Sequence, residues 1–312
     1  MTHTTPPSPL SPLPSRIPDV HGSRLISPLR RPEHGEGWLA DLVVDRRDPF
    51  FFDRPVDHVP GMLLVCAMAD LVAAGDAVPA AGRVEAAIAF HTTAALGTPT
   101  ELRADSFEDG RRRAVQVFQP ATLIADGWAE FSPAATAPGR TASAPMPVSA
   151  PVPVPVPVPV RSAHRGRPEN VLIGDPSEPG GVVTAAVLSP PAGHPLGGRR
   201  PGTRRTEAII ESGRQLSAWL AHRTTDWPPD ARLLPHGLTI DLPYGLPDTL
   251  PLALRRRPAP ISAHRTEYRY DLITRDGAGS RPLGTLAYTA RILRPRTRTG
   301  FRANRDVRRD AA

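Results

Sequence analysis

A run of alternating proline and valine, from Pro151 to Val160, constrains the folding of this chain more than any other feature. Every second residue of the run lacks a backbone N–H donor and has a fixed φ, so the run cannot form regular hydrogen-bonded structure. It favours the polyproline II conformation, which rises about 3.1 Å per residue. We interpret the run as a semi-rigid spacer of roughly 30 Å between two parts of the chain. A ligand for proline-binding domains is the alternative interpretation.

The spacer divides the chain into two parts of similar length. Its 312 residues leave room for two modest domains with their own cores. The expected organisation is a disordered tail, a first half, the linker, a second half and a basic tail, over residues 1–22, 23–135, 136–162, 163–295 and 296–312.

Both halves predict the same order of elements: a strand, a loop, one long helix and then several strands. Apolar residues at helical spacing predict that the second helix buries one face, formed by Ile209, Ile210, Gly213, Leu216, Trp219 and Leu220. The helices are expected over 60–74 and 207–222, and the strands over 37–44, 83–91, 101–105, 113–118, 122–131, 181–188, 238–242, 261–272 and 283–293. The fold class is therefore α+β, with a long helix beside an antiparallel sheet in each half.

Hydropathy and cysteine content indicate a cytoplasmic protein. No run of eighteen apolar residues occurs, so no membrane span is expected, and the first 18 residues lack the apolar core of a secretory signal. The single cysteine, Cys66, excludes an internal disulfide and a cysteine-based zinc cluster. The histidines show no metal-ligand spacing and no nucleotide-type glycine-rich loop is present, so no cofactor is expected.

The formal net charge of +7 comes entirely from arginine, because the chain contains no lysine. Aromatic residues make up only 5% of the chain, which argues against a platform for stacking bases, so nucleic-acid binding is not expected. Arginine forms planar, two-pronged contacts with phosphates. A phosphorylated substrate or an acidic acyl-carrier protein suits this composition equally well.

The stretch from Phe50 to Leu64 carries the most informative motif. Its prolines frame a tight turn, and the apolar run that follows Pro60 and Gly61 predicts the start of a buried helix. Asp57 and His58 lie in this turn, next to a helix N-terminus whose N–H groups point outward. His58 can donate a hydrogen bond to a thioester carbonyl or a phosphate, with Asp57 selecting its tautomer. The alternative is a capping aspartate and a turn histidine that only hold the corner.

The eleven residues from Phe52 to Met62 resemble the signature of the A-factor biosynthesis hotdog family, AfsA type. The resemblance continues in the second half, so it spans about 22–295 without the spacer; the usual order of the halves is reversed. The second-half segments are Arg167 to Gly174, Gly193 to Pro195, and Glu211 to Gln215. It implies a tandem double hotdog in which one chain supplies both halves of a dimer. It also implies condensation of a β-ketoacyl thioester, carried by coenzyme A or an acyl-carrier protein, with a phosphorylated three-carbon acceptor, as in γ-butyrolactone signal biosynthesis.

Glu211 is the strongest catalytic candidate. One turn into an apolar helix, its carboxylate is expected to be desolvated, which would raise its pKa and suit it to act as a general base. Arg214 and Gln215 follow at i+3 and i+4 on the same helix face and can orient it. The resemblance implies a catalytic role for Glu211, Arg214 and Gln215 and a substrate-binding role for Asp57, His58, Gly61 and His194. A solvated Glu–Arg pair on a helix edge is the alternative.

The first helix departs from the family motif. Cys66, Ala69 and Asp70 occupy the positions of the glutamate, arginine and glutamine, so one of two related sites is expected to be degenerate. Cys66 is either a nucleophile activated at a helix N-terminus or, as we favour, a small buried side chain. The degenerate motif leaves a non-catalytic acyl-binding or regulatory protein as one alternative. A hotdog thioesterase is another, because that chemistry needs only a carboxylate, which Glu211 could supply, and helix N–H groups.

An arginine cluster and the residues fourteen positions before the two helix motifs bear further on the chemistry. Arg199, Arg200, Arg204 and Arg205 precede the second helix and form either a phosphate clamp or a solvated charge run. Hotdog dehydratases place a histidine fourteen residues before the helix glutamate. Here Phe52 and Gly197 occupy the corresponding positions, which disfavours dehydration.

Overall fold

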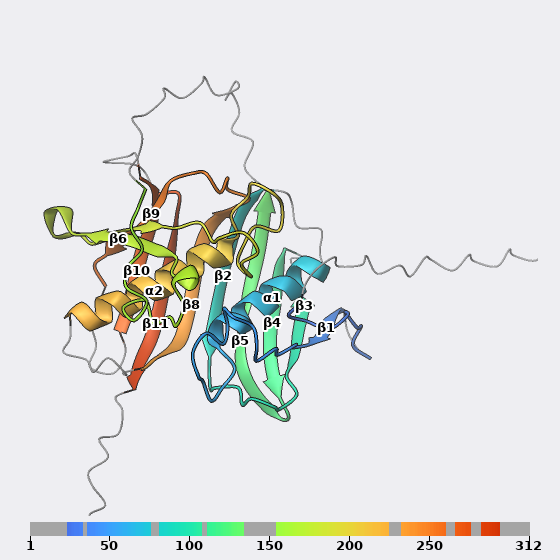
Figure 1. Cartoon of the computed structure of the whole chain (residues 1–312). Coiled ribbons are helices and arrows are strands. Elements are labelled where there is room, and N and C mark those ends of the chain that lie inside the picture. Colours follow the sequence, from blue (N-terminus) through green and yellow to red (C-terminus); the bar gives the residue numbers. More distant parts are fainter. Residues whose placement is uncertain are drawn as a thin grey trace, which may run out of the picture.

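The computed structural model places two helices on one face of a single eleven-stranded antiparallel sheet (Figure 1). The structure describes residues 24–33, 36–75, 81–107, 111–133, 154–224, 232–259, 266–275 and 282–293. The expected tails, 1–22 and 296–312, and linker residues 136–153 lie outside this description. No helix of the described residues is long and apolar enough to cross a membrane.

Each half contributes one helix and a set of strands. The first half forms β1 (Gly37–Asp41), α1 (Gly61–Gly75), β2 (Gly82–Phe90), β3 (Glu101–Ser106), β4 (Arg112–Gln119) and β5 (Thr122–Pro133). The second half forms β6 (Ile173–Ser177), β7 (Thr184–Val187), α2 (Thr206–Thr224), β8 (Arg232–Tyr244), β9 (Leu252–Arg257), β10 (Thr266–Thr274) and β11 (Gly284–Leu293). Two short 3-10 turns, η1 (Pro168–Asn170) and η2 (Pro179–Gly181), flank β6.

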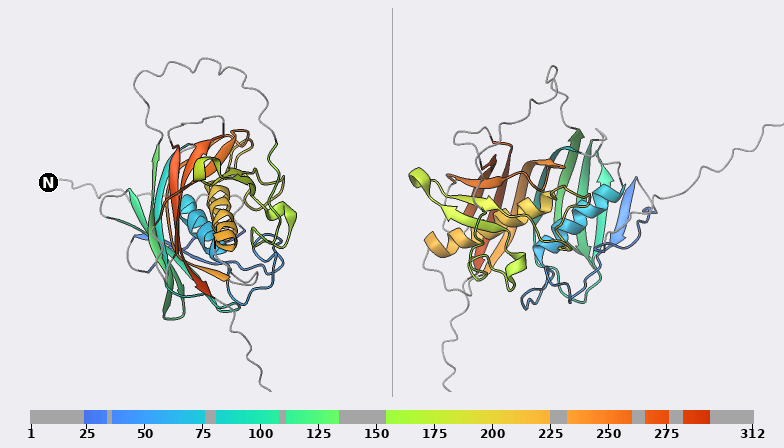
Figure 2. Two further views of the ribbon diagram at one scale, coloured as in Figure 1. Left: turned by 90° about the vertical axis from the view of Figure 1, so that its left-hand side faces the viewer. Right: turned by 45° about the horizontal axis from the view of Figure 1, so that its top comes forward.

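The order of the strands shows that the two halves are related by an internal twofold. The sheet reads β1-β3-β4-β5-β2-β8-β11-β10-β9-β7-β6, so β2 and β8 meet at its centre and corresponding strands follow outward on each side. Figure 2 shows α1 and α2 side by side against the same face of the curved sheet. This is the arrangement of a tandem double hotdog, as the sequence predicts.

The helices form where the sequence predicts them because both are almost entirely buried. α1 begins directly after Pro60 and carries the apolar run Met62 to Met68, which is buried all round its axis. α2 approaches the sheet closely at Gly213, where an added Cβ would lie 2.5 Å from the Leu286 side chain. The segments before α2 cover its outer face (Figure 2).

The two halves share one sheet and one hydrophobic cluster, as expected of an intrachain pseudo-dimer. Two features differ from the sequence-based expectation. Strands β6 and β9 form where the sequence pattern predicts none. The described part of the proline–valine run is not a free spacer. Val158 is buried and its N–H donates to the Ile173 carbonyl over 3.2 Å. The Val156 N–H donates to the Asp175 carboxylate over 2.9 Å, and the Asp175 N–H donates to the Val156 carbonyl over 3.0 Å.

Candidate functional site

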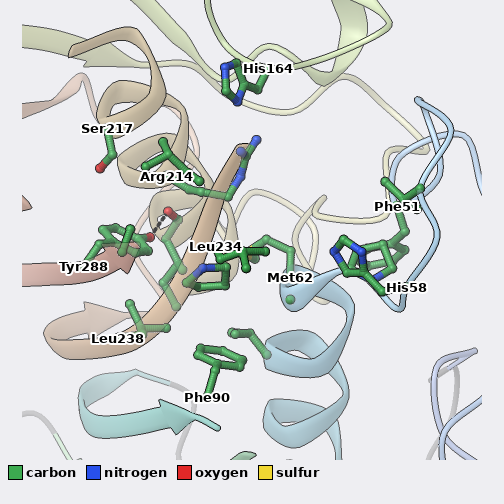
Figure 3. Close-up of a pocket in the computed structure, with 18 of the residues that line it drawn as sticks. Phe51, His58, Met62, Phe90, His164, Arg214, Ser217, Leu234, Leu238 and Tyr288 are labelled. Atoms are coloured by element: carbon green, nitrogen blue, oxygen red, sulfur yellow. Dashed lines mark hydrogen bonds between the residues drawn. The ribbon is translucent and has the colours of Figure 1, made fainter. Parts of the chain in front are cut away.

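A cavity of about 550 Å³ lies where the N-terminus of α1 faces the middle of α2 (Figure 3). We call it the first cavity. Its apolar walls come from both helices and from the central strands, and include Met62, Val65, Phe90, Ile210, Leu234 and Leu238. Its polar lining is concentrated in Asp53, Arg54, His58, His164, Arg165, Arg214 and Ser217. An apolar chamber with polar groups gathered around part of it is typical of a small-molecule site.

The turn before α1 supplies one side of this cavity. His58 and Gly61 line it, whereas Asp57 does not and leaves 78% of its side chain exposed. Asp57 Oδ1 lies 2.7 Å from His58 Nδ1, so the carboxylate stabilises the tautomer with its proton on Nδ1. Nε2 is then the nitrogen that can accept a proton from a ligand. Asp57 therefore acts on the cavity through His58.

Glu211, Arg214 and Gln215 lie together on α2, and a buried arginine completes the group. Arg214 donates to both carboxylate oxygens of Glu211, over 2.8 and 2.7 Å, and Gln215 donates over 2.7 Å. Arg165, which lies outside the helix, places Nη2 2.6 Å from Glu211 Oε1. The Glu211 side chain has no exposed surface, whereas Arg214 is 30% exposed and reaches into the cavity (Figure 3).

The expected pKa shift of Glu211 is wrong in sign. Burial does raise its pKa, but the charges of Arg165 and Arg214 and the hydrogen bonds from Arg214 and Gln215 outweigh burial and lower it to about 2. A carboxylate that is ionised this firmly is a weak base, and Glu211 does not line the cavity. Its role in this geometry is to hold Arg214, whose pKa it raises against the effect of burial.

Arg165 is the principal residue that the sequence analysis missed. Its side chain is 7% exposed, donates to the Phe50 carbonyl over 2.9 Å and stacks on the Phe50 ring at 4.2 Å. Nη1 lies 3.5 Å from Asp53 Oδ1. The next position, 166, requires glycine, because a Cβ added there would lie 2.1 Å from the Asp53 carbonyl oxygen. The signal available in the sequence was the His-Arg-Gly triplet just before the family segment that begins at Arg167.

His194 belongs to a structural network and does not line the first cavity. Its Nδ1 accepts a hydrogen bond from the Leu196 N–H over 3.0 Å, and Nε2 lies 3.2 Å from Asn170 Oδ1. Burial and the charge of Arg165 lower the pKa of His194 to about 4, so it is neutral near pH 7. Asn170 also donates to Asp53 over 3.1 Å, which joins the second half to the turn of the first.

A second histidine was also missed. His164 lines the cavity opposite His58 (Figure 3), in a left-handed conformation with φ of 53°. Its Nε2 contacts Nε2 of His222 on α2. Burial, followed by the charges of Arg214 and Arg54, lowers the pKa of His164 to about 3. It is therefore a neutral hydrogen-bonding group beside Arg214 rather than an additional cation.

Three of the four clustered arginines have partners within the protein, so they do not form an open phosphate clamp. Arg199 and Arg205 pair with Asp70, and Arg205 also pairs with Glu207. Arg204 donates to the carbonyl oxygens of Leu188 and Asp248, over 3.1 and 2.8 Å.

Cys66 on α1 is fully buried, and burial raises the pKa of its thiol. This confirms a packing role and leaves no accessible thiolate.

The buried network predicts how stability depends on pH. We expect the free energy of unfolding to fall as the pH is lowered from about 6.5 to about 2. The unfolded chain protonates His164 and His194 below about 6.5, whereas the folded protein does so only near pKa values of about 3 and 4. The unfolded chain also protonates Glu211 and Glu207 below about pH 4.5, whereas the folded protein keeps both ionised down to their pKa values of about 2. The unfolded state binds more protons throughout this window, so stability rises with pH. Denaturant titrations at several pH values measure this; a flat profile would contradict it.

Comparisons with known proteins identify the fold but no family. No family model and no curated protein matches the sequence. A putative thioesterase II from Thermobifida fusca is similar in structure, with a TM-score of 0.53 and 20% identity over 86% of this chain and 96% of that chain. The dehydratase domain of RzxB from Pseudomonas fluorescens is also similar, with a TM-score of 0.56 and 15% identity over 87% of this chain and 98% of that chain. A dehydratase domain from the CurJ module of curacin polyketide synthase has a TM-score of 0.57 and 13% identity over 87% of this chain and 96% of that chain. These similarities support the double hotdog fold.

Proposed function

We propose that the first cavity binds an acyl thioester and transfers its acyl group to the hydroxyl of a phosphorylated three-carbon acceptor. The observation that carries this proposal is Arg214, which projects from a buried ion-pair network into a cavity between the two helices whose walls are largely apolar. The resemblance to the A-factor biosynthesis family, present in the turn and in the α2 motif, supplies the reaction class.

The shape of the cavity suits an acyl chain with a polar end. Apolar side chains of α1, α2 and β8 would enclose the chain, as Met62, Ile210 and Leu238 do on three sides. Burial of an apolar chain contributes about 0.8 kcal/mol for each methylene group removed from water. The carbonyl would lie between the Arg214 guanidinium and the start of α1, which both line the cavity; the N–H groups of Gly61 and Met62 there precede the first intrahelical hydrogen bonds. Coenzyme A or an acyl-carrier protein would deliver the thioester.

Two positive groups suit a phosphorylated acceptor. Arg214 lies inside the cavity, and Arg54 lies exposed at its edge, close enough to His164 to influence its pKa. Counting Arg165, three guanidinium groups face two carboxylates, those of Asp53 and Glu211, which leaves a positive excess for a phosphate. Arginine binds phosphate with paired, charge-assisted hydrogen bonds.

His58 is the base that the geometry favours. In the proposed step, Nε2 of His58 removes the proton of the acceptor hydroxyl as its oxygen bonds to the thioester carbonyl carbon. Collapse of the resulting oxyanion breaks the C–S bond, and the departing sulfur takes the proton back from His58. Arg214 and the α1 N–H groups would stabilise the oxyanion. The products are the phosphorylated ester and the free thiol of the carrier.

His58→Gln is expected to lower kcat for acyl transfer about a hundredfold and to change KM little, because a general base acts in the transition state. Asp57→Asn should lower kcat less, since His58 keeps its place but loses its tautomer partner. Steady-state release of thiol with and without dihydroxyacetone phosphate measures both. Wild-type kcat in His58→Gln would remove His58 from the mechanism, whereas thiol release that ignores the acceptor would identify a thioesterase.

A further inference from the structure

A second cavity of about 290 Å³ lies where the N-terminus of α2 faces the middle of α1. It is the counterpart of the first cavity under the internal twofold. Ala69 lines it where Arg214 lines the first cavity, and Val72 lines it where Ser217 does. Val65, Ile210 and Leu238 line both cavities, so these side chains form the partition between them. The function proposed for the first cavity does not use the second cavity.

The second cavity is apolar over α1 and the sheet and basic at its α2 end. Val72 of α1, Val84 of β2 and Trp128 and Phe131 of β5 form part of its walls. At the other end lie Arg199, Arg200, Arg204 and Arg205, together with the carboxylates of Glu207 and neighbouring Asp70. Four guanidinium groups against two carboxylates leave an excess of two positive charges. The occupant that matches this division is an amphiphile with an anionic end.

Unpaired buried atoms at the same place indicate where the anionic end binds. Within the described residues, five buried side-chain atoms have no hydrogen-bond partner, and three of them belong to residues that line this cavity. They are Nε of Arg204, Nε of Arg205 and the hydroxyl of Tyr244. Arg204 is 6% exposed, so its Nε is not solvated in the folded protein. Buried polar groups without partners are rare and costly, and all three can donate to a ligand oxygen.

We propose that the second cavity is a binding site for a medium-chain carboxylate, such as a free fatty acid. The carboxylate accepts hydrogen bonds from Arg205 and Tyr244, and the chain lies between α1 and β2 as far as the partition. A water molecule takes up about 30 Å³, so the space suits a chain of roughly eight to ten carbon atoms. This site is independent of the function proposed for the first cavity.

Isothermal titration of the full-length protein with decanoate tests this site, with decanol as a probe that keeps the chain but lacks the charge. Ala69→Phe fills the second cavity from α1; the equivalent position of α2 already carries a long side chain, Arg214. Tyr244→Phe removes the unpaired hydroxyl and keeps the ring that packs against Phe131. We expect Ala69→Phe to lose one decanoate site, Tyr244→Phe to weaken it several-fold, and Arg214→Met, a first-cavity variant, to retain it.

Several results would overturn the site. They are a wild-type protein that does not bind decanoate saturably, decanol binding as tightly as decanoate, and a decanoate site that survives Ala69→Phe but vanishes in Arg214→Met. Thermal unfolding of each variant shows whether it is folded. If Ala69→Phe is unfolded, Tyr244→Phe decides the question, because unchanged affinity in that variant would contradict the proposed carboxylate contact. Loss of acyl transfer with decanoate binding intact would count against the first-cavity proposal alone.

Discussion

An Arg214→Met protein is expected to bind an acyl thioester about ten- to a hundredfold more weakly than the wild-type protein, with a parallel loss of turnover. Arg214 belongs to the buried network and lines the first cavity, and at 30% exposure it is more accessible than Arg165, which also lines the cavity but is 7% exposed. A hydrogen bond to a charged group contributes about 1.5–3 kcal/mol, which corresponds to this range. Methionine keeps most of the length and apolar bulk of the side chain, so the change isolates the guanidinium.

Arg223→Met is the matched control for this experiment. Arg223 lies near the end of the same helix, is 61% exposed and contacts Glu178 only at 4.0 Å, so its loss should leave affinity unchanged. Fluorescence or calorimetric titration with a non-hydrolysable acyl-coenzyme A analogue measures both variants. Equal affinity in wild type and Arg214→Met would mean that the guanidinium does not contact the ligand, and the proposed placement of the thioester would fail.

A Glu211→Ala protein is expected to lose about 3–5 kcal/mol of unfolding free energy, since removing one partner of a buried ion pair leaves the others uncompensated. Two guanidinium groups depend on this carboxylate, and Arg165 is itself buried. Glu169→Ala is the control: its pair with Arg167 spans 3.7 Å on the surface, and such pairs contribute less than about 1 kcal/mol. Urea denaturation at pH 7 measures both.

This measurement also separates two roles for Glu211. A general base can be replaced by glutamine with loss of turnover and little loss of stability, whereas the anchor of two arginines cannot. If Glu211→Gln is as stable as wild type and inactive, the base predicted from the sequence is correct and the network described above is secondary. We expect the opposite: lower stability, with turnover falling because Arg214 is no longer held.

The fold could be predicted from the sequence because the hydrophobic pattern and the family motifs indicate the same order of helices and strands. α1 is a continuous apolar run that begins after Pro60, α2 carries apolar residues at helical spacing, and most strands carry apolar alternation. The missed strands lack that pattern. β9 ends in three consecutive arginines, Arg255 to Arg257, and β6 contains Pro176 at the sheet edge. The valines of the proline–valine run gave no indication that Val158 would pack into the core.

Only those site residues that lie on one helix could be grouped from the sequence. Spacing placed Glu211, Arg214 and Gln215 on one face, as the structure has them. It could not bring in Arg165, which lies 46 residues earlier and pairs with Glu211 only through the fold. Against burial, the charge of Arg165 is the largest single cause that lowers the pKa of Glu211, so a prediction made without it lacks a main cause of the observed direction. His164 joined the cavity in the same way, across a long separation in sequence.

The most direct test of the central claim is incubation of the purified protein with a medium-chain β-ketoacyl-coenzyme A, with and without dihydroxyacetone phosphate, followed by mass spectrometry of the products. The structure and the family resemblance predict a phosphorylated ester that forms only with the acceptor and is lost in Arg214→Met and His58→Gln. Free acid in both reactions would replace transfer by hydrolysis. Unchanged thioester, with no measurable binding to the protein, would contradict the assignment of the first cavity as an acyl-thioester site.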